Sequence, residues 1–283
     1  MAPVLAHQHL IHQGAPAPSQ WMFFLHGIFG MGTNFRTIAK ALTARLPTWG
    51  FVLVDLRGHG ASQGFAPPHT LATAAADVEA LAVSLGLRID GIAGHSFGGK
   101  VALELLGGRA EPVDAALILD SMPGTRSSTE ELGDPMRVLA TLESISFPLP
   151  SREAFRERLL ADGYSAALTD WLTMNLRLDA GAYGLRLDLP TIRSLLADYF
   201  ATDLWSVVER PGAARQLGIV VGGRSQVFDE GARARLLRAR ETNPQLRATL
   251  LETAGHWVHV DDPKGLIDAM AETMQHPGSG TRA

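Results

Sequence analysis

Short apolar runs alternate with longer helical patterns along most of the chain, and this alternation is its strongest constraint on the fold. Six runs have the length and composition of β-strands: 21–26, 51–55, 89–95, 114–120, 217–223 and 247–253. Several are apolar on both faces, as in a parallel sheet covered by helices. Five segments have helical character: 34–46, 70–86, 97–107, 229–240 and 263–275. We therefore predict an α/β fold with a mainly parallel twisted sheet flanked by helices.

The alternation breaks once, and the break defines a predicted second domain. Residues 123–211 contain no convincing strand but several amphipathic helical stretches, such as TIRSLLADYFATDLW. We predict a helical cap inserted after the sixth strand, over the carboxyl edge of the sheet. Residues 1–122 and 212–283 would then form the core. The polar segment 4–14 is expected to add an edge strand or hairpin.

Composition excludes several classes of function. The chain of 283 residues has no cysteine, which rules out disulfides, thiol catalysis and thiolate metal sites. Its net charge of −4 gives no support for a nucleic-acid or membrane-surface role. The first residues lack the basic and apolar regions of a signal peptide, and no run is long enough to span a membrane. We expect a cytoplasmic protein.

The segment GHSFGGK, residues 94–100, follows a predicted strand and opens a predicted helix. A Gly-x-Ser-x-Gly sequence in that position is typical of a nucleophile elbow, a sharp turn that raises the serine hydroxyl above the sheet. We predict that Ser96 is the nucleophile. The amide of Phe97, at the start of the helix, would be one donor to the oxyanion.

The segment HGIFGMGTNF, residues 26–35, directly follows the first long apolar strand. Its His-Gly turn can present the amide of Ile28 as the second oxyanion donor, opposite Phe97. His26 is expected to tie the loop together by hydrogen bonding. Phe29 is expected to line the substrate pocket.

The segment TAGHWVHVDDP, residues 253–263, follows the last predicted strand. His256 comes after a glycine on a loop that can fold over the sheet edge, which makes it the predicted general base. His259 is the competing candidate, and we expect it to be structural. Trp257, beside the base, is predicted to contact substrate together with Phe29.

Taken together, HGIFG, DLRGHGAS, GHSFGGK and AGHWVH resemble the motifs of the α/β-hydrolase superfamily over nearly the whole chain. More narrowly, HGIFG followed by TNF, Lys100 after the double glycine, WLTMNLRL and GHWVH resemble the YbfF-like serine esterases. That resemblance implies a serine hydrolase that acts on acyl esters and thioesters.

The acid that would orient His256 is harder to place. The turn VGGRSQVFD, residues 221–229, is where this fold usually carries the carboxylate, but it offers Ser225 and only later Asp229. Asp229 opens a predicted helix, where an acid favours the helix dipole without any catalytic role. Asp120 ends the strand after the nucleophile, at the edge where sites in open α/β sheets collect. The YbfF-like resemblance also allows an acid there. We predict Asp120, with Asp229 as the alternative.

These residues predict a carboxylesterase that cleaves short to medium acyl (thio)esters through an acyl-enzyme. Two alternatives remain open. The same triad could perform C–C bond hydrolysis, elimination or perhydrolysis, or the chain could be a non-catalytic ligand-binding protein. We expect no cofactor and no metal, since no carboxylate or cysteine accompanies the histidines of segment 4–14. The expected partner is a small-molecule acyl ester or thioester, with no nucleic acid and no membrane, for a monomer or homodimer.

Overall fold

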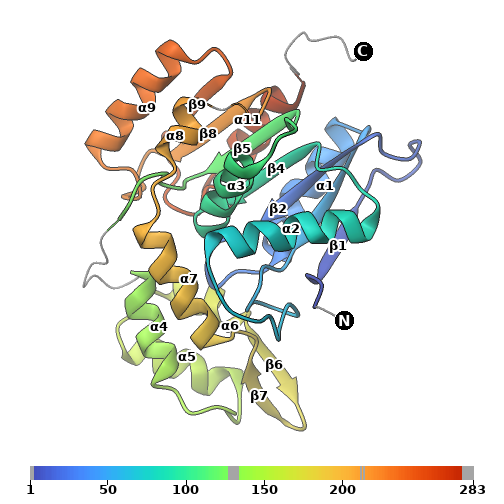
Figure 1. The fold of residues 1–283 in the computed structure, drawn as a ribbon. Coiled ribbons are helices and arrows are strands. Elements are labelled where there is room, and N and C mark those ends of the chain that lie inside the picture. The colour runs from blue at the N-terminus through green and yellow to red at the C-terminus, as the bar shows by residue number, and fades with distance from the viewer. Residues whose placement is uncertain (1–2, 127–133, 211, 213, 276–283) are drawn as a thin grey trace.

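The computed structural model describes residues 3–126, 134–210, 212 and 214–275, and its centre is a seven-stranded sheet (Figure 1). The strand order is β1-β3-β2-β4-β5-β8-β9. Every neighbouring pair is parallel except β1 with β3, which is antiparallel. The strands are β1 (His7–Leu10), β2 (Gln20–Leu25), β3 (Trp49–Val54), β4 (Gly91–His95), β5 (Ala115–Leu119), β8 (Leu217–Gly222) and β9 (Leu246–Leu251). The predicted strands and the predicted edge strand are thus confirmed.

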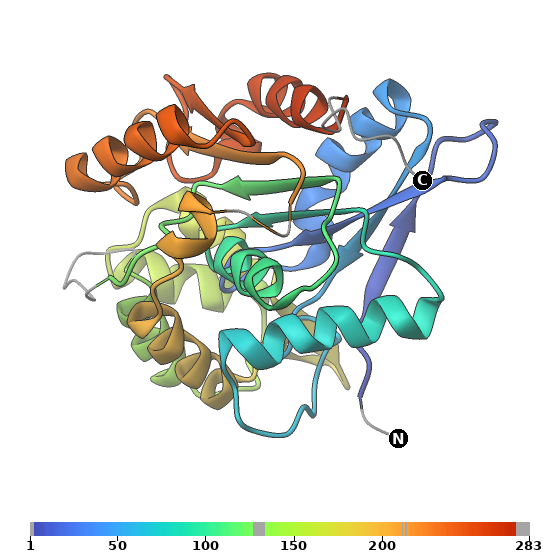
Figure 2. The ribbon, with the colours of Figure 1, turned by 45° about the horizontal axis from the view of Figure 1, so that its top comes forward.

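Helices cover both faces of the sheet (Figures 1 and 2). Two separate apolar clusters lie against the two faces, and strands β3, β4, β5 and β8 are buried along their whole length. Burial on both faces explains why these strands read as continuous apolar runs. The flanking elements are a short 3₁₀ helix η1 (Gly32–Phe35), α1 (Arg36–Arg45), α2 (Leu71–Leu85), α3 (Phe97–Gly108), α9 (Glu230–Thr242), α10 (Val258–Asp261) and α11 (Pro263–Gln275).

The helix ends follow from local chemistry. The side chain of Asp229 accepts a hydrogen bond from the amide of Ala232 and caps α9. Asp262 accepts from the amide of Gly265 and precedes the first residue of α11, Pro263. Among the described residues, no helix is both long enough and apolar enough to cross a membrane.

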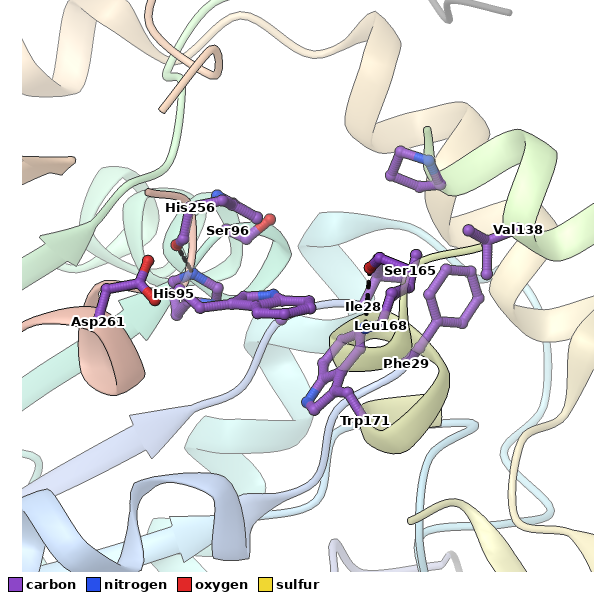
Figure 3. Close-up of a pocket in the computed structure, with 13 residues that line it drawn as sticks. Ile28, Phe29, His95, Ser96, Val138, Ser165, Leu168, Trp171, His256 and Asp261 are labelled. Carbon is purple, nitrogen blue, oxygen red and sulfur yellow. Dashed lines mark hydrogen bonds between the residues drawn. The ribbon is translucent and has the colours of Figure 1, made fainter. Parts of the chain in front are cut away.

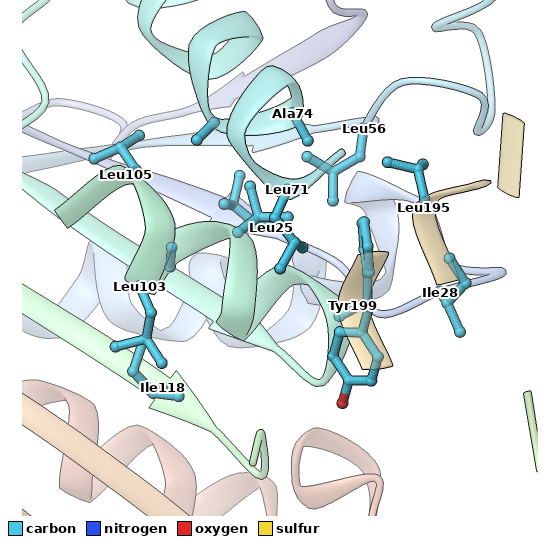
Figure 4. Packing of buried hydrophobic residues seen from close by; sticks show 14 of the residues in the cluster. Leu25, Ile28, Leu56, Leu71, Ala74, Leu103, Leu105, Ile118, Leu195 and Tyr199 are labelled. Atoms are coloured by element: carbon cyan, nitrogen blue, oxygen red, sulfur yellow. The ribbon is translucent and has the colours of Figure 1, made fainter. Parts of the chain in front are cut away.

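A helical insertion separates β5 from β8. It consists of α4 (Pro135–Glu143), α5 (Arg152–Ala161), α6 (Ala166–Thr173), α7 (Leu189–Ala201) and α8 (Trp205–Glu209). The insertion follows the fifth strand along the described chain, not the sixth, because the segment before β2 supplies only β1. Helix α7 buries its predicted apolar face, and Figure 4 shows Leu195 and Tyr199 close to core residues such as Leu71 and Leu56. The insertion and the sheet thus share one apolar cluster, and the predicted division into two domains stays a prediction.

The expectation that this region contains no strand is wrong. Strands β6 (Leu176–Asp179) and β7 (Ala182–Leu185) form an antiparallel hairpin. Its turn uses Ala180 and Gly181, both with positive φ, at 47° and 84°. Each strand has only four residues, so the alternation of LRLD in β6 is too short to stand out among the surrounding helical patterns.

Candidate active site

Ser96 lies in a sharp turn between β4 and α3. Its backbone angles are φ 52° and ψ −116°, a strained conformation for a residue other than glycine. The turn brings two glycines into close contact: a Cβ on Gly94 would lie 2.1 Å from the carbonyl oxygen of Gly98. The amide of Ser96 donates to Leu119, and the hydroxyl of Ser121 donates to the Ser96 carbonyl at 2.6 Å. The neighbouring strand β5 therefore holds the turn in place.

Asp120 follows β5 directly and is fully buried. Its Oδ2 atom lies 2.7 Å from Nδ1 of His256 and accepts a 2.5 Å hydrogen bond from the Ser225 hydroxyl. Its Oδ1 accepts from the amide of Gly222 at 3.0 Å. The carboxylate is held by three donors from two other segments of the chain. It is therefore positioned to fix the orientation of the His256 ring.

The loop that carries His256 is anchored by other histidines. The Nε2–H of His95 donates to the carbonyl oxygen of His256 at 2.8 Å. Burial lowers the pKa of His95 well below its usual value and lowers that of His259 to about 4. Both rings are neutral at physiological pH, and neither contacts Asp120. The structure thus brings His256, not His259, to the acid.

Two buried histidines hold the loop after β2. His26 donates from Nδ1 to the carbonyl of Gly27 and accepts from the amide of Leu56, as its predicted tying role requires. His59 accepts from the amide of Phe29 at 3.3 Å. Burial lowers the pKa of His26 to about 4 and that of His59 to about 3. The Phe29 amide is already paired, because it donates to the neutral His59 ring. The amides of Ile28 and Phe97 therefore remain the predicted oxyanion donors.

An apolar cavity of about 340 Å³ opens beside Ser96 and His256, and we call it the tryptophan cavity. Figure 3 shows Ser96 and His256 at one end and Phe29, Leu168 and Trp171 at the other. Its lining residues are Gly27, Ile28, Phe29, His95, Ser96, Pro135, Val138, Ser165, Leu168, Trp171, His256, Trp257 and Asp261. The rings of Trp171 and Trp257 lie 5.7 Å apart. The structure thus places Phe29 and Trp257 in one cavity with Ser96.

Three residues of the site are not identified as functional by any sequence pattern. Tyr199 belongs to the apolar face of α7, yet it lines a cavity together with Ser96 and Arg126. Burial raises the pKa of Tyr199, so the hydroxyl is protonated. Asn175, in the stretch WLTMNLRL, donates to the carbonyl of Phe29 at 2.7 Å. His59 is the third, and its only clue is its place in the motif DLRGHG.

Other candidates have structural partners. The alternative acid Asp229 caps α9. In the motif DLRGHG, Arg57 forms a buried ion pair with Asp77, and Asp55 accepts from the amides of Gly32 and Ala61. These contacts leave Asp120 as the carboxylate that meets His256.

Comparison with known proteins agrees with this architecture. The sn-1-specific diacylglycerol lipase ABHD11 of Mus musculus is 29% identical over 283 residues, which cover 97% of this chain and 86% of the lipase. N-formylmaleamate deformylase of Pseudomonas putida is 25% identical, with 85% and 88% covered. A solved marine microorganism esterase has a TM-score of 0.80 at 22% identity and covers 96% of this chain and 100% of its own. Residues 22–269 match the Alpha/beta hydrolase family, over most of the chain, and the protein therefore belongs to that family.

Proposed function

We propose that the protein is a serine carboxylesterase that cleaves esters or thioesters of short to medium acyl chains. The observation that carries the proposal is the 2.7 Å contact between His256 and Asp120, beside a serine held in a strained strand-to-helix turn. The similarity to a diacylglycerol lipase and to an esterase supports ester chemistry. The tryptophan cavity supports an apolar acyl chain of limited length.

The proposed reaction proceeds in two steps. His256 takes the proton of the Ser96 hydroxyl as the oxygen attacks the ester carbonyl, and Asp120 stabilises the resulting imidazolium. The amides of Ile28 and Phe97 bind the oxyanion, and His256 returns the proton to the departing alcohol or thiol. Water then attacks the acyl-enzyme by the same route and releases the acid. We include a cytoplasmic location and a monomeric or homodimeric state in the proposal, to be tested by cell fractionation and size-exclusion chromatography.

A panel of para-nitrophenyl esters of increasing acyl length tests the proposal, with Ser96→Ala as the matched control. We expect hydrolysis that depends on Ser96 and declines for chains too long for the cavity. A fluorophosphonate should label the wild type and not Ser96→Ala. Labelling without hydrolysis of any ester would point to another reaction of the same residues. The absence of both would favour a ligand-binding protein.

A further inference from the structure

A second cavity, of about 290 Å³, lies on another side of Ser96. We call it the arginine cavity, because Arg126 and Arg224 line it together with Tyr199 and Gln226. It shares Ile28, Ser96, Pro135 and His256 with the tryptophan cavity. The nucleophile therefore stands where two differently lined cavities meet, and each cavity is positioned to receive one side of a scissile bond.

The two cavities differ in charge. The arginine cavity has two guanidinium groups and one carboxylate, Asp134, which caps α4. In the described part of the chain, neither arginine lies within ion-pair distance of a carboxylate. In the tryptophan cavity, Asp261 is the only charged group among the lining residues apart from the histidines. A surplus of positive charge thus lies on one side of the nucleophile only.

Ser96, Tyr199 and Arg126 line this one cavity together. Because its volume is only about 290 Å³, an anionic group a few bonds from an ester carbonyl at Ser96 can reach Arg126. Arg224, which is exposed, lines the same cavity and can meet the anion from its outer side.

We propose that the natural substrate is an ester or thioester with an anionic group, a carboxylate or a phosphate, on one side of the scissile bond and an apolar group on the other. Arg126 and Arg224 bind the anion, and the tryptophan cavity holds the apolar part. Arginine suits this role because its fork of donors binds carboxylate and phosphate oxygens in pairs. This inference rests on the proposed esterase function and names its substrate class.

Three esters of matched size test the inference. Para-nitrophenyl valerate is neutral, and the mono-para-nitrophenyl ester of glutaric acid adds a carboxylate on the acyl side. The valerate ester of a nitro-hydroxybenzoic acid instead carries the carboxylate on the alcohol side. Wild-type protein should prefer one of the two anionic esters over the neutral ester in kcat/KM. The preferred ester identifies the side of the bond that enters the arginine cavity.

The variants Arg126→Gln and Arg224→Gln, alone and together, should reduce this preference. A charge-assisted hydrogen bond contributes about 1.5–3 kcal/mol, which corresponds to a loss of roughly tenfold to a hundredfold in kcat/KM for the preferred ester. The readout is the ratio of anionic to neutral turnover, because Arg126 lines the same cavity as Ser96 and its loss can slow both reactions. Arg186→Gln, an exposed arginine of the insertion outside both cavities, is the matched control and should leave the ratio unchanged.

An unchanged ratio in the Arg126→Gln/Arg224→Gln double variant would overturn the inference, provided that its melting temperature shows a folded protein. So would a wild type that prefers the neutral ester to both anionic ones. Failure of the proposed function looks different, because no ester is then cleaved in a Ser96-dependent manner. In that case, calorimetric titration of glutarate into Ser96→Ala and into Ser96→Ala/Arg126→Gln/Arg224→Gln tests the anion site alone. Equal binding of glutarate by both proteins would also overturn the inference.

Discussion

The hydroxyl of Ser225 donates a 2.5 Å hydrogen bond to Oδ2 of Asp120. The same oxygen lies 2.7 Å from Nδ1 of His256. A serine therefore occupies the turn after β8, where the fold usually carries its acid, and supports a carboxylate that comes from β5 instead. The two side chains therefore form one hydrogen-bonded unit that joins the turn after β8 to the residue that follows β5.

Asp120→Asn should remove nearly all esterase activity. An asparagine cannot fix the required tautomer of His256, and loss of that tautomer in a triad lowers kcat by about 10⁴-fold. Turnover of a para-nitrophenyl ester at saturating substrate measures the effect. The matched control is Asp229→Asn, which keeps an oxygen acceptor at the N-cap of α9 and should leave both activity and stability nearly unchanged. An inactive Asp229→Asn beside an active Asp120→Asn would contradict the assignment.

Ser225→Ala should weaken the support of the acid without abolishing it. The variant removes one hydrogen bond to a buried carboxylate, worth about 1.5–3 kcal/mol, from both stability and the orientation of Asp120. Denaturant titration and kcat measure the two effects. In the background of Asp120→Asn, we expect Ser225→Asp to raise kcat roughly tenfold, because a carboxylate at this turn can approach the freed His256. No gain in the double variant would show that the turn cannot deliver an acid.

The stability of the protein should fall steeply between neutral pH and about pH 4. His26 and His59 have pKa values of about 4 and about 3 in the folded protein, below their usual value of 6.5. The unfolded chain then binds more protons in this range, so acid favours unfolding, by on the order of 3 kcal/mol per histidine. Denaturant titrations of the wild type and of His59→Gln check this. The variant should be less stable at pH 7 but lose less stability towards pH 4, and an equal loss in both proteins would refute the explanation.

Lys100 joins α3, the helix that follows Ser96, to the insertion. Its buried ammonium donates to the carbonyls of Tyr199 and Thr202 and lies 4.6 Å from the centre of the Tyr199 ring. Lys100→Met leaves these carbonyls without that donor, and we expect a loss of about 1–3 kcal/mol of stability for each. Burial also lowers the pKa of Lys100 from its usual 10.5 to about 8.

The pH dependence of stability isolates the contribution of the Lys100 charge. Between pH 8 and 10.5 the unfolded chain binds more protons than the folded protein, so wild-type stability receives an increasing contribution from Lys100 as the pH rises. The difference in unfolding free energy between wild type and Lys100→Met should therefore grow across this range. A constant difference would mean that the amine does not titrate there.

Most of the sheet could be predicted because its strands are buried on both faces and leave a continuous apolar pattern. The helix boundaries at Asp229 and Asp262 were equally predictable, because capping is a local property of a few residues. The hairpin β6–β7 could not be predicted. Its strands have only four residues each, and β7 pairs with a distant segment through backbone hydrogen bonds between Tyr183 and Leu149, which no local pattern indicates.

The site was predictable only where a tight turn dictates the residue type. The glycines around Ser96 indicate a tight turn, because any larger side chain at these positions would collide with the backbone. Asp120 could be proposed from its place at the end of β5, and the sequence still left Asp229 open. Tyr199 and Arg126 lie 103 and 30 residues after Ser96, on segments whose position depends on how the whole insertion packs. No local rule brings them into one cavity with Ser96.

The position of Asp120 also divides the three proposed catalytic residues unevenly along the polypeptide. Ser96 and Asp120 both precede the insertion, on β4–α3–β5, whereas His256 follows it. A protein cut within the insertion would thus carry two of these groups on its amino-terminal fragment and one on its carboxyl-terminal fragment. The fragments meet along β5 and β8, where Leu119 pairs with Val220. Recovery of esterase activity after the two fragments are mixed would show that β5 and β8 had paired in the correct register.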